Sequence, residues 1–141
     1  LIAKHSGEIR SFDGDRVMGV FLGQTKNTDA VKAALQLNWV VKNLINRRIK
    51  SQYPNANYEV RHTVGIDTSE LIAIRAGVRD SNDIAWIGGA ANHAAKLNGL
   101  SSNWSTRITG TVYDRMLDQA KFGGDPRRNM WENAFGHRWK I

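Results

Sequence analysis

Two aspartates separated by one glycine, Asp13-Gly14-Asp15, stand between two short apolar segments near the start of the chain. Asp-Gly suits a two-residue hairpin turn because glycine tolerates positive φ, so we expect Asp13 and Gly14 to form the turn. The apolar run that begins at Val17 is typical of a strand buried on both faces. Asp15 would then lie at the mouth of a buried strand, where a carboxylate must be paired, hydrogen-bonded or bound to a metal ion. An ordinary polar role in the turn is the competing interpretation for both aspartates.

A second pair of polar side chains, Asn92 and Lys96, is spaced four residues apart in a segment rich in alanine. Four residues is about one helical turn, so both side chains share a face of the expected helix. They could bind one ligand together, or they could simply be solvated. The preceding Gly88-Gly89 would let the backbone approach a ligand at the helix N-terminus, although glycine pairs are also ordinary in loops. We expect His93 to pack or face solvent rather than bind a metal, because no second histidine lies three or four residues away.

The composition predicts one globular domain over residues 1–141. The chain has 41% hydrophobic and 23% charged residues, as soluble domains do. It has no cysteine, which excludes disulfides and thiolate sites. No apolar run approaches the roughly 20 residues that span a bilayer, so we expect a cytoplasmic protein with no membrane partner. The net charge of +7 is spread along the chain and could attract the phosphates of a nucleic acid or of a nucleoside triphosphate.

The sequence pattern mixes helices with hairpins, so the expected fold class is α+β. Leu1–His5 is expected to be the last turn of a helix. A long amphipathic helix should run from an N-cap at Asn27 or Thr28 to about Ile49. The other expected elements are antiparallel strands at 58–66 and 71–78 with a turn at 67–69, a polar loop at 79–83, helices at 90–100 and 112–117, a strand at 107–109, a loop at 121–128 and closing strand material at 131–141.

Three separated blocks of the chain together resemble the class III nucleotidyl cyclase catalytic domain. They are the hairpin Gly7–Phe21, the block Val64-Gly65-Ile66-Asp67, and the block Trp86–Leu97 with its sequence I-G-G-A-A-N-H-A-A-K-L. The resemblance runs from about residue 1 to residue 110 and keeps the order and spacing of the family's motifs. It implies a ferredoxin-like βαββαβ core. Family members begin with a strand and a helix that this chain lacks, and the strand carries a first metal-binding aspartate, which we expect upstream of residue 1.

The resemblance also implies roles for individual residues. Two divalent metal ions, Mn²⁺ or Mg²⁺, would be held by a pair of carboxylates of which Asp15 is the second. Asn92 would orient the ribose. Lys96, at a position where the family normally has arginine, would neutralise the pentavalent phosphate without the bidentate fork of arginine. Arg138 and Lys140 are candidates for binding the triphosphate, with surface solvation as the competing interpretation.

Two departures from the family pattern bear on the nucleobase. Purine cyclases of the family read the base with a lysine and with an aspartate or threonine, at positions that here hold Ser11 and Ala85. Alanine has no side-chain hydrogen-bonding group, so a purine reader would lose specificity. The blocks look like those of bacterial pyrimidine cyclases of the Pycsar anti-phage system. That likeness implies UTP or CTP as substrate, with a preference for uracil, and cyclic UMP or cyclic CMP as a signal for a separate effector protein.

Such cyclases work as head-to-tail homodimers, in which each site takes its metal carboxylates from one chain and its asparagine and basic residue from the other. Three alternatives remain from the sequence. The domain could be an inactive, nucleotide-binding or dimerising relative, because Lys96 replaces arginine, or it could be a purine (adenylate) cyclase. Nucleic-acid binding is suggested by a pI of about 10.1 and five tryptophans. We do not expect it, because Trp39 falls within the apolar stripe of the long helix.

Overall fold

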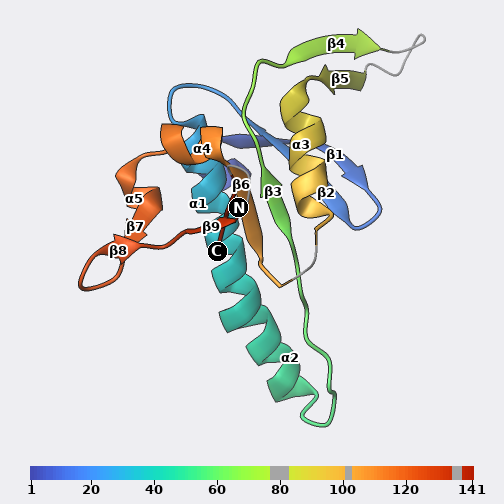
Figure 1. Ribbon diagram of the computed structural model, residues 1–141. Helices are drawn as coiled ribbons and strands as arrows, with labels where there is room; N and C mark the ends of the chain where they lie inside the picture. Colours follow the sequence, from blue (N-terminus) through green and yellow to red (C-terminus); the bar gives the residue numbers. More distant parts are fainter. Residues whose placement is uncertain (77–82, 101–102, 135–137) are drawn as a thin grey trace.

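The structure, a computed structural model, describes residues 1–76, 83–100, 103–134 and 138–141 (Figure 1). After a short 3₁₀ turn, η1 (Ala3–His5), the chain forms an antiparallel hairpin of β1 (Gly7–Asp13) and β2 (Arg16–Phe21). Asp13 pairs with Arg16, so the two turn residues are Gly14 and Asp15 rather than Asp13 and Gly14. Gly14 has φ +59°, a conformation that glycine adopts without strain and that favours it at the first central position of a type II′ turn.

The expectation that the second strand is buried on both faces is wrong in this structure. Val17 is 51% exposed, and only Val20 within β2 is fully buried. The hairpin forms a two-stranded sheet of its own, and part of its apolar run stays exposed.

One long helical segment supports the rest of the fold. It comprises α1 (Lys26–Val40), the π-helical η2 (Val41–Ile45) and α2 (Asn46–Gln52). Its N-cap is Thr25, earlier than the expected Asn27 or Thr28, both of which are buried inside the first turn. The apolar stripe is buried at Val31 and again at Val41, but Trp39 is 55% exposed and Leu44 52% exposed. The argument against nucleic-acid binding that placed Trp39 in the core is therefore wrong.

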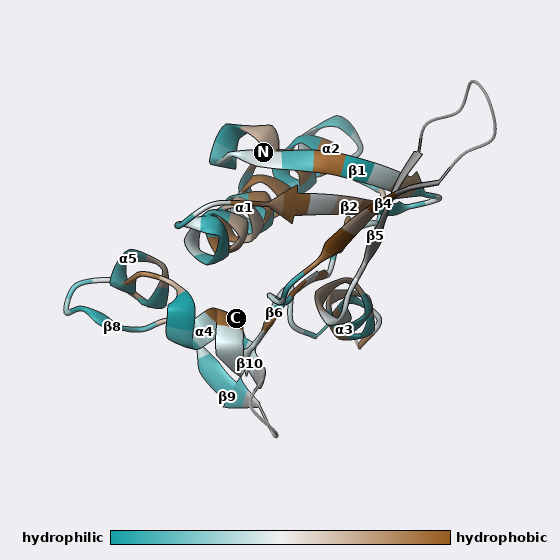
Figure 2. Ribbon diagram, turned by 90° about the horizontal axis from the view of Figure 1, so that it is seen from above, coloured by the Kyte–Doolittle hydropathy of each residue, from teal (hydrophilic) through white to brown (hydrophobic). Residues whose placement is uncertain are grey.

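The central sheet has four strands in the order β3 (Val64–Ile66), β6 (Thr106–Thr109), β10 (Arg138–Lys140) and β9 (Glu132–Ala134). β3 and β6 are parallel, and the other neighbours are antiparallel. The helix α3 (Gly89–Asn98) packs mainly on β3, and α1 contacts both β3 and β6. Seen from above, α3 and α1 lie on opposite sides of the strand β6 (Figure 2). This arrangement places α3 on the face of the sheet opposite the long helix.

The strand expected at 58–66 is confirmed only for its last residues. The side chain of Asn46 accepts from the backbone N–H of Val60 at 2.9 Å and donates to its carbonyl at 3.0 Å. These two bonds satisfy backbone groups that would otherwise need a partner strand, so the segment before Val64 runs extended along the helix without joining a sheet.

The expected pairing of 71–78 with 58–66 is wrong. β4 (Ile72–Ala76) pairs instead with β5 (Asp83–Ile87) in a separate two-stranded antiparallel sheet. Of the polar loop expected at 79–83, Asp83 begins β5, and the other positions lie outside the described residues. The hairpin forms because β4 and β5 adjoin in sequence, whereas β3 pairs with the distant β6.

The C-terminal part follows the expectations in outline. The strand at 107–109 is confirmed as β6. α4 (Gly110–Arg115) begins earlier than expected and ends before Leu117. The loop expected at 121–128 instead contains the end of α5 (Asp118–Lys121) and the short pair β7 (Phe122–Gly123) and β8 (Arg128–Asn129). One buried cluster among the described residues joins this region to α1, and its members are Val31, Ile108, Val112, Met116, Ala120 and Trp131.

Candidate active site

The tip of the first hairpin carries Asp15, the predicted metal ligand, and Asp13, for which the sequence predicted a turn role. Asp15 lies in the turn and Asp13 at the end of β1, and both are exposed. Asp15 is therefore not at the mouth of a buried strand, and burial does not force it to find a partner. Its exposure leaves the carboxylate accessible to a cation or to a second molecule.

Carboxylate oxygens fit the hard divalent cations that the resemblance implies. Mg²⁺ in particular is often held by one or two carboxylates together with substrate phosphates, and the exposed Asp15 suits that arrangement. Within the described ranges, no group of three or more His, Asp or Glu side chains is close enough together to form a complete metal cage. The exposed Asp15 thus fits a metal that is shared with a phosphate ligand.

The two predicted base-reading positions lie on different hairpins. Ser11 is exposed on β1, where it pairs with Met18 just after an irregularity in the register. Ala85, on β5, pairs with Ile74 of β4. The side chain of Ala85 lies outside the described residues. The two hairpins belong to separate sheets, so strand pairing does not connect the two positions.

Asn92 and Lys96 lie one turn apart on α3, and both side chains are exposed. The opposite side of the helix carries Ala90 and Leu97, both 5% exposed, which seat it on the sheet. The predicted shared face therefore exists and is open to a ligand.

Alternate residues of the segment that contains β3 hold α3 in place. Thr63 donates to the backbone carbonyl of Asn98 at 2.9 Å and to its side-chain oxygen at 2.8 Å. Ser69 accepts from the backbone N–H of Ala90 at 3.0 Å. Gly65, between them, lies against the helix backbone, since a Cβ on it would be 2.7 Å from the nitrogen of Asn98. These contacting residues are separated by even numbers of positions, because alternate side chains of an extended segment share one face.

Gly88 also lacks room for a side chain, but the group that it approaches is not a ligand. A Cβ at Gly88 would lie 2.6 Å from the Leu71 side chain and 2.8 Å from the carbonyl oxygen of Glu70. The glycine allows the chain entering α3 to pass close to the chain entering β4. The expectation of a ligand at this point has no support from these contacts.

The fourth contact of this face joins Asp67 to α3, and the sequence patterns did not reveal it. Asp67 Oδ2 lies 3.0 Å from Nδ1 of His93, and Oδ1 accepts from the hydroxyl of Thr109 at 2.6 Å. The Asp67 side chain is 7% exposed, whereas that of His93 is 61% exposed. The one available sequence signal was the spacing of polar and small residues at 63, 65, 67 and 69, which marks a face covered by another element.

The C-terminal candidates for binding a triphosphate lie on β10. The Arg138 side chain is outside the described residues. The Lys140 amine lies 3.5 Å from a carboxylate oxygen of Glu132 and 4.0 Å from the centre of the Trp104 ring. The Lys140 ammonium is thus already paired with a carboxylate and an aromatic face.

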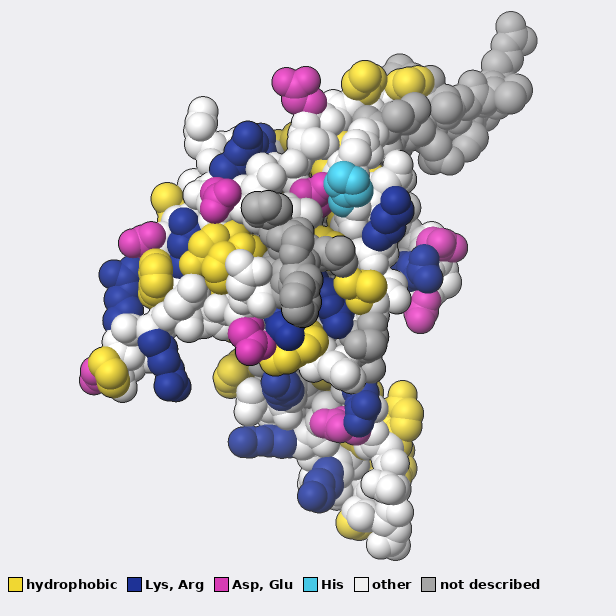
Figure 3. All heavy atoms as spheres, in the orientation of Figure 1, with side chains coloured by type: hydrophobic (Ala, Val, Ile, Leu, Met, Phe, Trp, Pro, Cys, Tyr) yellow, Lys and Arg dark blue, Asp and Glu magenta, His cyan; other side chains and the backbone are white. Residues whose placement is uncertain are grey.

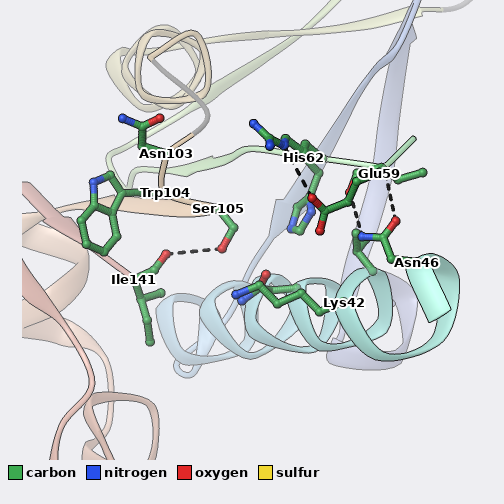
Figure 4. A pocket seen from close by; sticks show the side chains of 12 residues that line it. Lys42, Asn46, Glu59, His62, Asn103, Trp104, Ser105 and Ile141 are labelled. Carbon is green, nitrogen blue, oxygen red and sulfur yellow. Dashed lines mark hydrogen bonds and ion pairs between the residues drawn. The ribbon is translucent and has the colours of Figure 1, made fainter. Parts of the chain in front are cut away.

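A cavity of about 300 Å³ lies away from the predicted residues, between the long helix and the segment before β3 (Figure 4). Its wall includes Lys42, His62 and Trp104. Burial, followed by the charge of Lys42, lowers the pKa of His62. None of the candidate site residues lines this cavity.

The fold is that of class III nucleotidyl cyclase catalytic domains. The structure superposes on the guanylyl cyclase Cya2 with a TM-score of 0.72 and 16% sequence identity, over 99% of this chain and 71% of that one. It superposes on a bacterial light-regulated adenylyl cyclase with a TM-score of 0.73 and 21% identity, over 99% of this chain and 40% of that one. The expected α+β cyclase fold is confirmed.

At the level of sequence, the chain is homologous to proteins named uridylate cyclase. It is 38% identical to one from Xanthomonas perforans over all of its length and 65% of the relative. It is 44% identical to one from Burkholderia cepacia over 93% of its length and 56% of the relative. The chain thus spans about three-fifths of the length of these two relatives. No protein-family model matches it, and no helix in its described parts is long and apolar enough to cross a membrane.

Proposed function

We propose that the protein is a pyrimidine nucleotide cyclase that converts UTP, in preference to CTP, to the 3′,5′-cyclic monophosphate and pyrophosphate. The observation that carries this proposal is the 38–44% identity to proteins named uridylate cyclase over nearly the whole chain. Ser11 and Ala85 support it, because neither supplies the groups with which purine cyclases of the family read the base.

The chain's residues would act on the two ends of the reacting bond. Asn92 would hydrogen-bond the ribose and orient its 3′-oxygen toward the α-phosphorus. Lys96 would place a positive charge beside the α-phosphate as negative charge builds up there. The new bond joins the 3′-oxygen to phosphorus, the bond to the β-phosphate oxygen breaks, and pyrophosphate leaves as the hydroxyl proton passes to solvent.

Asp15 would hold Mn²⁺ or Mg²⁺ together with the substrate phosphates. When bound, such ions lower the pKa of the attacking hydroxyl and neutralise charge on the triphosphate. Asp13 would remain a residue of the turn region, next to the metal position without a defined role in it.

We also propose a homodimer with Asp15 of one chain facing Asn92 and Lys96 of the other. The exposed apolar side chains of the two hairpins support an interface of this kind, since such patches often mark protein contacts. They include Phe12, 73% exposed, and Ile72, 64% exposed. A twofold axis would build two equivalent sites.

The biological role is proposed from the resemblance to the Pycsar cyclases alone. The cyclic nucleotide would be a cytoplasmic second messenger in anti-phage defence, and a separate effector protein would bind it. Nucleic acid and membranes would not be partners.

The decisive experiment uses the protein in its full native length with Mn²⁺. UTP, CTP, ATP and GTP are supplied separately, and the products are identified by mass spectrometry. Cyclic UMP or cyclic CMP alone supports the proposal, and their ratio gives the base preference. Cyclic AMP or cyclic GMP would show that Ser11 and Ala85 do not exclude purines. Nucleotide binding without any cyclic product would identify an inactive, cyclase-like binding domain.

A further inference from the structure

The Asp67 carboxylate is almost fully buried, yet it forms a hydrogen bond with a histidine at the surface. Removing a carboxylate from water is unfavourable unless hydrogen bonds replace its hydration. Asp67 receives two such bonds, from Nδ1 of His93 at 3.0 Å and from the Thr109 hydroxyl at 2.6 Å. Its side chain is 7% exposed and that of His93 is 61% exposed. The carboxylate therefore fixes the orientation of an imidazole that remains open to solvent.

Thr109 shows that this arrangement is favoured over an ordinary local bond. Thr109 is the N-cap residue of α4, but its side chain makes no capping hydrogen bond. An N-cap threonine commonly stabilises its helix by accepting from a backbone N–H of the first turn. Here the hydroxyl binds Asp67 instead, so the fold forgoes the cap and holds the carboxylate.

Other contacts hold the helix besides the bond from Asp67 to His93. Thr63, Gly65 and Ser69 already attach α3 at its C-terminal end, its middle and its N-terminus. The side chain of Leu97, a residue of α3 itself, is also buried. What Asp67 adds is the orientation of one imidazole ring, with Nδ1 held and the Nε2 edge left for another group.

His93 adjoins Asn92 in sequence and lies three residues before Lys96, so it neighbours Lys96 on the helix surface. The face of the molecule that carries α3 shows histidine, basic and acidic side chains together at the surface (Figure 3). Lys96 offers a point charge without the directed fork of an arginine. When the ring carries a proton on both nitrogens, the N–H held by the Asp67 carboxylate leaves the other N–H directed outward.

We propose that His93 binds a phosphate oxygen of the nucleoside triphosphate beside Lys96, and that Asp67 is its positioning residue. This inference rests on the proposed function, because it deepens the role of the same helix face. The Nε2–H of His93 would supply the directed donor that lysine lacks at position 96.

The test measures phosphate binding separately from turnover. The dissociation constant of 3′-deoxy-UTP, which cannot cyclise, and the inhibition constant of pyrophosphate are measured with Mn²⁺ on the full-length protein and its variants. We expect His93→Ala to raise both constants about tenfold, which is the loss of one hydrogen bond to a charged group. His93→Gln, which keeps a neutral N–H donor, should raise them less. Unchanged constants in His93→Ala would overturn the inference.

A double-mutant cycle tests the positioning role of Asp67. Asp67→Asn should weaken both ligands in the wild-type background and add little in the His93→Ala background. Equal losses in both backgrounds would show that Asp67 only supports the fold. Thr63→Val is the matched control, because it breaks hydrogen bonds at the other end of α3. It should lower the urea midpoint without selectively raising the pyrophosphate constant.

The two proposals can fail separately. If the wild type forms a cyclic pyrimidine nucleotide and His93→Ala binds both ligands normally, only this inference is wrong. If the wild type forms no cyclic product but His93→Ala binds 3′-deoxy-UTP tenfold more weakly, the phosphate contact stands and the cyclase function falls. If Asp67→Asn does not fold, the two His93 variants still decide the question.

Discussion

Gly65 of β3 lies directly against the carbonyl oxygen of Ala94 in α3, with no space between them for a side chain. A Cβ at Gly65 would overlap that oxygen, and it would lie 2.7 Å from the backbone nitrogen of Asn98 and 2.9 Å from the Cβ of Leu97. Most of these are backbone atoms, which cannot turn aside as a flexible side chain can. The distance between strand and helix, and with it the position of Asn92 and Lys96, therefore depends on a glycine here.

Replacing Gly65 with alanine should force α3 away from the sheet. We expect a loss of about 3 kcal/mol in the free energy of unfolding, at the upper end of what overpacking usually causes. Urea unfolding followed by circular dichroism measures it. Gly99→Ala is the control, since a Cβ there meets nothing closer than 3.6 Å. Equal stability of the two variants would mean that strand and helix are not in close contact.

The sequence predicted the parts of the site that depend on local patterns. The Asp-Gly-Asp motif located the hairpin tip to within one residue, because turn chemistry is set by adjacent residues. The alanine-rich segment located α3 almost to its ends, and the spacing of Asn92 and Lys96 follows from helix geometry alone.

The parts that it could not predict depend on contacts between distant residues. Asp67 and His93 are 26 positions apart, and neither motif shows that the fold brings them together. The predicted partner of β4 was wrong for a similar reason, because hydrophobic alternation indicates a strand but not the strand with which it pairs. Val60 likewise is a residue type common in strands, yet its backbone N–H and carbonyl form hydrogen bonds with the side chain of Asn46 instead of a neighbouring strand.

Asn92→Ala should abolish cyclisation without unfolding the protein. The side chain is exposed, so its removal creates no cavity, and the loss should fall on the transition state. We expect turnover to fall about 100-fold or more, as when one oriented hydrogen bond to a reacting centre is removed. Product formation from UTP and the urea midpoint are measured in parallel.

Asn43→Ala is the matched control for Asn92, because Asn43 is also a helical asparagine, and its amide donates locally to the Trp39 carbonyl at 3.0 Å. It should retain wild-type turnover. Retained turnover in Asn92→Ala would mean that the exposed face of α3 does not contact the ribose.

Thr28→Val should destabilise the junction between the long helix and the C-terminal region. Thr28 is 2% exposed, and its hydroxyl accepts from the backbone N–H of Leu117 at 2.9 Å. Valine keeps the shape but leaves that N–H without this acceptor, which should lower the unfolding free energy by about 1–2 kcal/mol. Thr111→Val, at an exposed position of α4, should change it by less than about 0.5 kcal/mol. Equal urea midpoints for Thr28→Val and the wild type would show that the Thr28 hydroxyl does not contribute to stability.

His62 should make the fold less stable in mild acid. Burial, and secondarily the charge of Lys42, lowers the pKa of His62 below its ordinary value of 6.5. Below pH 6.5 the unfolded chain takes up a proton at this residue while the folded protein does not. Because the unfolded state then binds more protons, the free energy of unfolding falls as the pH drops from 6.5 toward the lowered value. At pH 7.5 both states are neutral there, and the effect vanishes.

His62→Gln removes this proton uptake and keeps a polar side chain at the cavity wall. Between pH 7.5 and 5.5 the wild type should therefore lose more unfolding free energy than His62→Gln, as measured by urea titration at each pH. Lys42→Met should reduce the difference without abolishing it, because burial is the larger cause of the lowered pKa. Parallel pH dependences of wild type and His62→Gln would show that the imidazole is as well hydrated in the folded protein as in the unfolded chain.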